Sequence, residues 1–188
     1  MQAKTEATPS DRDLRLLAHD ALTDDDALML FGERIDMQVE RIGGKLVVSP
    51  PMGFDGGVRE NDLAYLITTW ARSHGYVTTS PSANYRLPDG DAPAPDVGLV
   101  RQDRVDSMSE RERKKIPSLV PDIVVELLSE SQRTPSAVSI ERAKCERWFK
   151  AGAHYVVLID PFSRKTTVWG EAPVDFPDLI SVFGPPPT

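Results

Sequence analysis

The sequence predicts a mixed α/β domain in which one central β-sheet is flanked by helices. Two neighbouring stretches carry this prediction. Residues 121–129 form a short apolar run, rich in Ile and Val and opened by a proline, which is typical of a buried strand. Residues 136–151 then read as a helix, with Pro135 at its start and Gly152 just past its end.

The first half of the chain alternates helical and strand patterns. Leu14, Leu16 and Leu17 indicate a short helix over residues 11–19. Carboxylates at residues 24–26 cap a second helix that runs to about Phe31. In order, the patterns predict a β-hairpin over 37–48 that turns at Gly43-Gly44, a helix over 57–74, and strands over 76–79 and 83–87.

The second half supplies most of the predicted sheet. A proline-rich loop over 88–95 leads into a strand over 96–100. Residues 101–117 are polar, with a helix expected after Ser109. The central strand and its helix follow, and then two further strands over 155–159 and 165–169.

Composition places the chain among ordinary globular proteins. Its 188 residues suffice for one domain with a core. We expect a disordered N-terminus over 1–9, a single domain over 10–171, and a proline-rich C-terminal tail over 172–188 that runs over the surface. No apolar segment approaches the roughly 20 residues of a membrane span, and the N-terminus lacks the apolar core of a signal peptide. With a single cysteine, these features predict a cytoplasmic protein.

The net charge of −7 argues against a protein that binds nucleic acid through broad electrostatic attraction. It leaves room for an enzyme whose acidic site recruits Mg²⁺ before phosphate approaches. Arg111, Arg113, Lys114 and Lys115 form a basic run that could contact phosphates, but a solvated basic helix is the favoured interpretation.

Glu126 is the most informative residue, because it lies inside the apolar run of the central strand. An ionised carboxylate there costs several kcal/mol unless a cation or strong donors compensate. A metal ion, a lysine or an arginine should therefore face Glu126.

The following helix offers such a cation. At about 100° per residue, Lys144 and Glu141 fall in one arc with the apolar residues Ala137, Ile140, Cys145, Trp148 and Ala151. Cys145 has no evident histidine partner, so we interpret it as a core thiol rather than a nucleophile. A buried lysine beside a buried carboxylate is the simplest joint explanation of both residues.

Asp96 adds a second carboxylate at the start of a neighbouring strand. Two such carboxylates can share Mg²⁺, and a lysine beside them could orient or deprotonate a water or stabilise charge on phosphate. Each residue also has a structural interpretation. Asp96 could be a strand-start residue, Glu126 and Lys144 a buried ion pair, and Glu141 an i,i+3 partner of Lys144.

Several ordered segments together resemble the Uma2 family of restriction-endonuclease-like proteins in the PD-(D/E)xK nuclease superfamily. They are Pro95-Asp96, Val125–Ser129, Lys144-x-x-x-Trp148-x-x-Ala151-Gly152, Tyr155–Pro161 and the hairpin segment Val39–Pro50. The resemblance extends over about residues 23–170.

The resemblance implies a restriction-endonuclease-like core with a Mg²⁺ site, at which Mn²⁺ would substitute. Asp96 and Glu126 would be the metal ligands, and Glu40 matches an early acidic position of the family. The superfamily's usual lysine position is Leu128 here, and the family places its lysine on the following helix, at Lys144. Family members often carry a histidine where this chain has Gly56.

Two hypotheses of different classes follow. The first is a Mg²⁺-dependent endonuclease that hydrolyses phosphodiester bonds in DNA, with catalytic residues Glu40, Asp96, Glu126 and Lys144. By analogy with such nucleases, it would act as a homodimer. The alternative is a catalytically inactive nuclease-fold module for binding or assembly, in which the same residues form a structural buried ion-pair network.

Overall fold

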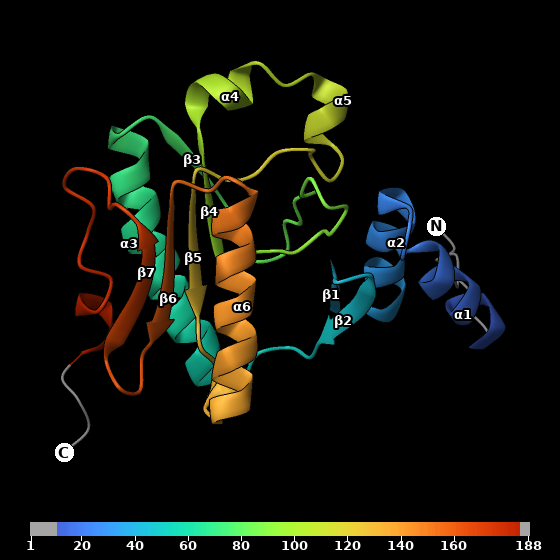
Figure 1. Cartoon of the computed structure of the whole chain (residues 1–188), viewed down its shortest axis with the longest axis horizontal. Helices are drawn as coiled ribbons and strands as arrows, with labels where there is room; N and C mark the ends of the chain where they lie inside the picture. The colour runs from blue at the N-terminus through green and yellow to red at the C-terminus, as the bar shows by residue number, and fades with distance from the viewer. Residues whose placement is uncertain (1–10, 185–188) are drawn as a thin grey trace, which may run out of the picture.

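A five-stranded mixed β-sheet forms the centre of the protein, whose computed structural model describes residues 11–184 (Figure 1). In spatial order the strands are β3 (Tyr76–Thr79), β4 (Val97–Arg101), β5 (Ile123–Leu127), β6 (Tyr155–Asp160) and β7 (Lys165–Gly170). Only β5 and β6 are parallel, and all other neighbours are antiparallel. The predicted mixed α/β fold is confirmed, while the predicted disorder of residues 1–9 lies outside the described residues.

Helices cover both faces of this sheet. Successive residues of a strand point to opposite faces, so each strand contributes side chains to both layers. On β5, Ile123, Val125 and Leu127 pack toward helix α3 (Phe54–Ser73), with which they share one core cluster. Val124 belongs to the cluster on the opposite face, under helix α6 (Pro135–Ala151). Since Glu126 has the same parity as Val124, it points toward α6.

Helix α6 has clear start and stop signals. The Thr134 hydroxyl accepts a hydrogen bond from the Ala137 backbone N–H, and Pro135 occupies the first turn, where its missing N–H costs nothing. Gly152 ends the helix with a positive φ of 120°, which favours glycine. The helix connects β5 to its parallel neighbour β6 as a crossover.

The N-terminal elements form a smaller unit beside the sheet (Figure 1). It comprises helices α1 (Asp11–Asp20) and α2 (Asp25–Ile35) and the hairpin of β1 (Gln38–Ile42) and β2 (Lys45–Ser49), which is a sheet of its own. Asp24 caps α2 as predicted, by accepting from the Ala27 N–H, although the helix continues four residues past Phe31. A third hydrophobic cluster ties this unit to Ala92 and Ile116.

Two sequence predictions in the middle of the chain need correction. Residues 83–87 are not a strand, because their backbone hydrogen bonds go singly to Pro93, Pro117 and Asp91 rather than to one neighbouring strand. Residues 102–113 hold two short helices, α4 (Gln102–Asp106) and α5 (Glu110–Arg113), of which only the second was predicted. Ser109 and Glu112 start α5 with a reciprocal capping box.

Part of the C-terminal segment packs into the hydrophobic core on one face of the sheet. After β7 it returns to the α3 face of the sheet, where Leu179 is buried and the Phe176 ring packs edge-on against Trp70 and Tyr155. A short 3₁₀ turn, η2 (Ser181–Phe183), ends the described segment. Within residues 11–184, no helix combines the length and the apolar character that a membrane crossing requires.

Candidate active site

Asp96, the residue directly before β4, lies opposite Glu126 of the neighbouring antiparallel strand β5. The β4–β5 register pairs Val97 with Val125, so one further step brings Asp96 opposite Glu126 on the α6 face. Asp96 Oδ2 accepts a hydrogen bond of 2.6 Å from the Leu127 N–H. The two carboxylates are therefore held side by side at the edge where β5 ends.

Lys144 enters this site from α6. Its Nζ lies 3.2 Å from Glu126 Oε1 and 3.1 Å from Glu40 Oε1, and it donates to the Ala94 carbonyl at 2.8 Å. Four residues further along the same face, Trp148 Nε1 donates to Glu126 Oε1 at 2.9 Å. The buried glutamate thus has both the cation and the strong donor that its position requires.

Glu40 comes from the hairpin, outside the central sheet. It lies on β1, is 5% exposed, and accepts from the Ala94 N–H at 2.8 Å. The structure therefore brings all four residues singled out in the sequence to one place. The helical-wheel prediction holds for Lys144, Cys145 and Trp148, but Ile140 is 67% exposed.

Burial and crowding shift the protonation equilibria of this cluster. Burial raises the pKa of Glu126 to about 8, even though the charge of Lys144 acts in the opposite direction. Burial likewise raises the pKa of Asp96, and nearby Glu40 adds to the effect. Burial disfavours the charged form of Lys144, yet the surrounding carboxylates outweigh it and raise the pKa of this lysine, so Lys144 stays protonated.

Two residues of the site were not found from the sequence. Glu60 lies on α3, and burial together with the charge of Asp96 raises the pKa of Glu60 to about 7. Gln132 follows β5, accepts from the Ser129 N–H at 2.8 Å and donates to Glu141 Oε1 at 2.6 Å. Glu141 is thus oriented by Gln132 and has no ion pair of 4 Å or less with Lys144. Only the three-residue spacing of Ser129 and Gln132, a capping pattern, could have indicated this contact.

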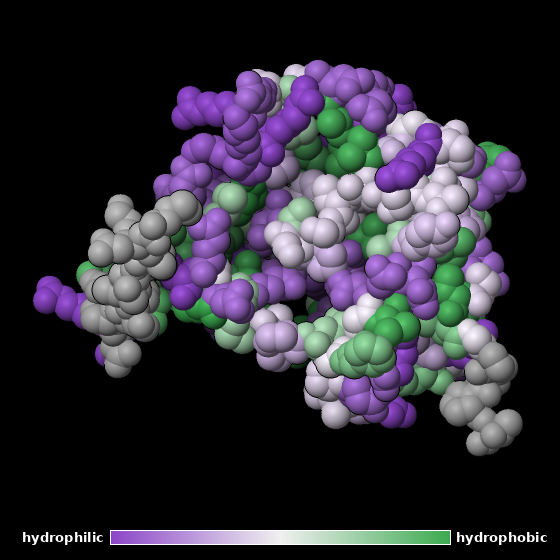
Figure 2. Space-filling model, turned by 180° about the vertical axis from the view of Figure 1, so that it is seen from behind, coloured by the Kyte–Doolittle hydropathy of each residue, from purple (hydrophilic) through white to green (hydrophobic). Residues whose placement is uncertain are grey.

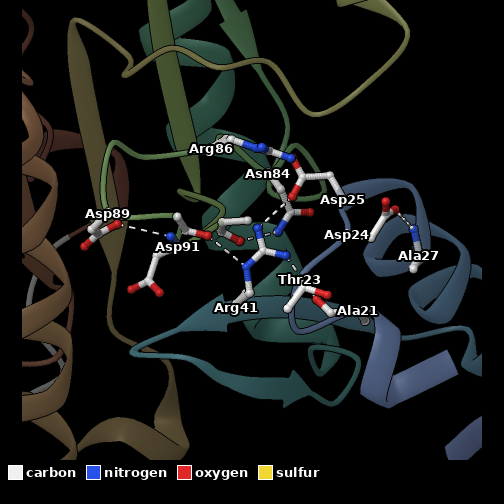
Figure 3. A network of polar contacts seen from close by, with 12 residues as sticks. Ala21, Thr23, Asp24, Asp25, Ala27, Arg41, Asn84, Arg86, Asp89 and Asp91 are labelled. Atoms are coloured by element: carbon white, nitrogen blue, oxygen red, sulfur yellow. Dashed lines mark hydrogen bonds and ion pairs between the residues drawn. The ribbon is translucent and has the colours of Figure 1, made fainter. Parts of the chain in front are cut away.

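A buried arginine fixes the hairpin that carries Glu40 (Figure 3). Arg41 is 4% exposed and donates to Asp25 Oδ1 at 2.6 Å, to the Ala21 carbonyl at 3.0 Å and to the Gly90 carbonyl at 2.8 Å. Its backbone also pairs with Ala92 in both directions. Because Arg41 follows Glu40 directly, these bonds fix the strand from which Glu40 reaches the site.

A second set of contacts joins the hairpin turn to α6. Asp91 accepts from the Gly43 and Gly44 N–H groups, at 2.8 and 3.4 Å, and pairs with Arg147. Both glycines have positive φ, of 60° and 69°, as this turn requires. Arg147 lies on the helix that carries Lys144, so Asp91 connects the elements that supply Glu40 and Lys144.

Carboxylates dominate the site, and they are a ligand type that hard divalent cations prefer. Four carboxyl groups, those of Glu40, Asp96, Glu126 and Glu141, surround a single lysine, and nearby carboxylate charge helps to raise the pKa values of Asp96, Glu126 and Glu141. Mg²⁺ typically takes one or two carboxylates and keeps several waters. Over residues 11–184 there is no group of three or more His, Cys, Asp or Glu arranged to hold a metal. The fit therefore rests on the Asp96–Glu126 pair.

Other residues considered in the sequence lie outside this cluster. Arg111 and its basic neighbours are on and after α5, beyond the end of β4, and β4 runs opposite to β5. They are thus at the far edge of the sheet (Figure 1). Burial raises the pKa of the fully buried Cys145 thiol, as expected of a core residue. A side chain at position 56 would collide with Met52, whose Cγ lies 2.5 Å from the position that a Cβ on Gly56 would take.

Comparisons with known proteins identify the family and agree with the fold. The model of the Uma2 family, described as "putative restriction endonuclease", matches residues 26–178. A crystal structure of a protein from Anabaena variabilis, described as a putative nuclease, has a TM-score of 0.58 to this chain at 19% sequence identity. The match covers 79% of this chain and 92% of that one, and at this identity it shows the shared fold. No curated protein matches the chain.

Proposed function

The chain belongs to the Uma2 family, and we propose that it is a Mg²⁺-dependent endonuclease that hydrolyses phosphodiester bonds in DNA. The observation that carries this proposal is the meeting of Asp96, Glu126 and Lys144 at one edge of the sheet. Two carboxylates opposite each other, with a lysine against one of them, are a recurrent arrangement for hydrolysing phosphate esters with a metal.

Asp96 and Glu126 would hold the metal ion, for which Mn²⁺ would substitute. When bound, such an ion polarises the phosphate and lowers the pKa of a coordinated water. Asp96 is half-buried as a residue and its Oδ2 accepts from the Leu127 N–H, whereas Glu126 is 2% exposed and is oriented by Trp148. On the face shown in Figure 2, a hollow bordered by hydrophilic residues lies between the N-terminal unit and the body of the protein.

Lys144 would act as a fixed positive charge. Because its pKa is raised, it is a poor proton acceptor, so it would position the attacking water or stabilise negative charge on the phosphate rather than deprotonate the water. Glu40 and the Ala94 carbonyl would hold its Nζ in place. Glu60, with a pKa of about 7 beside Asp96, is better suited to accept a proton at neutral pH.

A second candidate function is an inactive nuclease-fold module for binding or assembly. One observation favours it: Lys144 Nζ already has three partners, namely Glu40, Glu126 and the Ala94 carbonyl. A structural ion-pair network would look similar and would need no metal.

Under the nuclease function, we also propose that the protein is cytoplasmic and that it acts as a homodimer that cuts two strands.

Mn²⁺ binding, followed by electron paramagnetic resonance with and without duplex DNA, tests the metal site. We expect the parent protein to bind Mn²⁺ and Glu126→Gln to lose at least about tenfold in affinity, because one carboxylate ligand is removed. Glu146→Gln is the matched control, since Glu146 is exposed on the outer face of the same helix. It should bind as the parent does.

Plasmid cleavage then tests catalysis. Asp96→Ala and Lys144→Ala should abolish Mg²⁺-dependent nicking, while Glu146→Gln retains it. If the parent binds no Mn²⁺ at millimolar concentration even with DNA, the endonuclease proposal is overturned in favour of the inactive module. Cleavage by Asp96→Ala at the parental rate would contradict the assigned site.

A further inference from the structure

Two arginines from distant parts of the chain lie against one aromatic ring. The guanidinium carbon of Arg59, on α3, is 5.1 Å from the centroid of Phe162, and that of Arg133, in the loop after β5, is 4.7 Å from it. Phe162 lies in the turn that follows β6, where the Asp160 carboxylate accepts from its backbone N–H at 2.9 Å. Because this hydrogen bond orders the turn, the Phe162 ring has a fixed position against both guanidinium groups.

These residues surround the edge of the sheet at which the candidate active site lies. β5 and β6 are parallel, so Arg133 and Phe162 both follow strand ends at that edge. Arg133 comes directly after Gln132, which orients Glu141, and Arg59 directly precedes Glu60. Arg59 is tied to the same edge through Phe162, whose ring centroid lies 5.1 Å from its guanidinium carbon.

Stacking leaves much of a guanidinium's binding capacity unused. A guanidinium that lies over an aromatic face keeps its five N–H donors free for planar partners such as phosphate. Arg133 forms one ion pair, from Nη1 to Glu130 Oε1 at 2.6 Å, and its side chain is 56% exposed. Within residues 11–184, Arg59 forms no ion pair with a carboxylate.

The negative charge of the chain makes local positive charge necessary for binding phosphate. With a net charge of −7, the protein as a whole repels the phosphates on both sides of a bond to be cleaved. The other basic segment cannot serve here. It lies at the opposite edge of the sheet, and its Lys114 and Lys115 are already paired with Glu110 and Asp26.

We propose that Arg59 and Arg133, held against Phe162, form a binding site for a backbone phosphate of nucleic acid beside the carboxylate cluster. The identity of the ligand as nucleic acid rests on the proposed function. The site would read no bases, and it would contribute a salt-dependent part of the binding free energy.

Fluorescence anisotropy of a labelled DNA duplex tests this site, with Ca²⁺ in place of Mg²⁺ to prevent cleavage and with salt varied. Arg59→Ala/Arg133→Ala should weaken binding at least about tenfold. It should also reduce the slope of log K against log salt by about 0.9 for each phosphate that the variant no longer neutralises. Phe162→Leu should weaken binding too, because the guanidinium groups lose their platform. Arg111→Ala/Arg113→Ala, which removes the same charge at the far edge, should change neither quantity.

Equal affinity and an equal salt slope for the parent and Arg59→Ala/Arg133→Ala would overturn the proposal, and so would a parent that binds no duplex. The Mn²⁺ measurement is independent of this result. If the parent binds Mn²⁺ but no duplex, only the phosphate site fails. If the duplex is bound through Arg59 and Arg133 but no Mn²⁺ is bound, the phosphate site stands on an inactive module. Far-UV circular dichroism and thermal unfolding establish that each variant is folded.

Discussion

Glu126 is the one charged residue of the buried strand β5. Its neighbours Val124, Val125 and Leu127 are apolar and buried with the strand. The desolvation cost of the carboxylate must therefore be offset by a cation or donors on the α6 face of the sheet. Lys144 and Trp148 supply it from one helical face. Even so, burial keeps the pKa of Glu126 near 8, so folding favours the protonated acid.

Replacing Lys144 should destabilise the fold more at high pH than at low pH. A carboxyl whose pKa is raised in the folded protein binds more protons when folded than when unfolded, from its unfolded pKa near 4.5 up to about 8. Stability therefore falls as pH rises through this window. Lys144→Met removes the charge that limits this fall, so we expect a loss of about 3 kcal/mol or more at pH 9 and a clearly smaller loss at pH 6.

Urea unfolding of Lys144→Met and of the parent at both pH values measures this difference. Lys150→Met is the control, since Lys150 is an exposed residue of the same helix whose pair with Glu146 is on the surface. Its effect should be small and independent of pH. Losses of equal size at pH 6 and pH 9 for Lys144→Met would show that the lysine does not offset buried carboxylate charge.

At the scale of elements, the hairpin and α6 depend on each other through polar contacts rather than through a common core. Arg41 joins the hairpin to the loop between α1 and α2 and to Gly90, and Asp91 joins the hairpin turn to α6 (Figure 3). Next to Asp91, Ala92 pairs with Arg41. Residues 91–96 therefore connect the hairpin to Asp96, so the position of the hairpin affects the position of Asp96.

Arg41→Met should lower the free energy of unfolding by about 1–3 kcal/mol, because the largely buried Asp25 loses one of its two arginine partners and keeps only Arg86. It should also weaken Mn²⁺ binding, since Glu40 and Lys144 lose their fixed relation. Arg41→Lys should recover part of both quantities. Chemical denaturation and the Mn²⁺ titration measure them, and Arg34→Met, at an exposed position in the last turn of α2, is the control. Parental Mn²⁺ affinity in Arg41→Met would rule out this positioning role.

At the scale of the whole molecule, the C-terminal segment completes the core on the α3 face. Leu179 is 5% exposed, and Phe176 contacts aromatic rings from both α3 and β6. The sheet would otherwise expose apolar side chains beside α3 on this face, so the segment belongs to the fold and is not a linker.

Leu179→Ala should reduce the free energy of unfolding by about 2–5 kcal/mol, the usual cost of a cavity in a packed core. Val174→Ala is the matched control, because Val174 lies in the same segment and is 82% exposed. It should change stability by less than about 0.5 kcal/mol. Thermal and urea unfolding measure both variants. A Leu179→Ala variant as stable as Val174→Ala would mean that the segment does not contribute to the core.

Sequence alone determined the elements whose signals are local. The caps of α2 and α6, the Gly43-Gly44 turn and the apolar run of β5 each follow from residues within a few positions of one another. The same local logic identified Glu126 and Lys144, since each is a charge in an apolar pattern. The prediction of a strand over residues 83–87 was wrong because their apolar pattern fits an extended segment equally well with or without a neighbouring strand.

Only the tertiary structure decided which distant residues meet. Glu40 joins the site because Arg41 and Asp91 fix a separate hairpin against it, and Glu60 because the sheet packs on α3. Asp96 faces Glu126 because of the β4–β5 register, which no local pattern specifies. The Arg59–Phe162–Arg133 contact joins residues from three separate segments, none of which carries a signal by itself. Local propensity is set by nearest neighbours, whereas chemistry at a site depends on long-range packing, which only the folded chain provides.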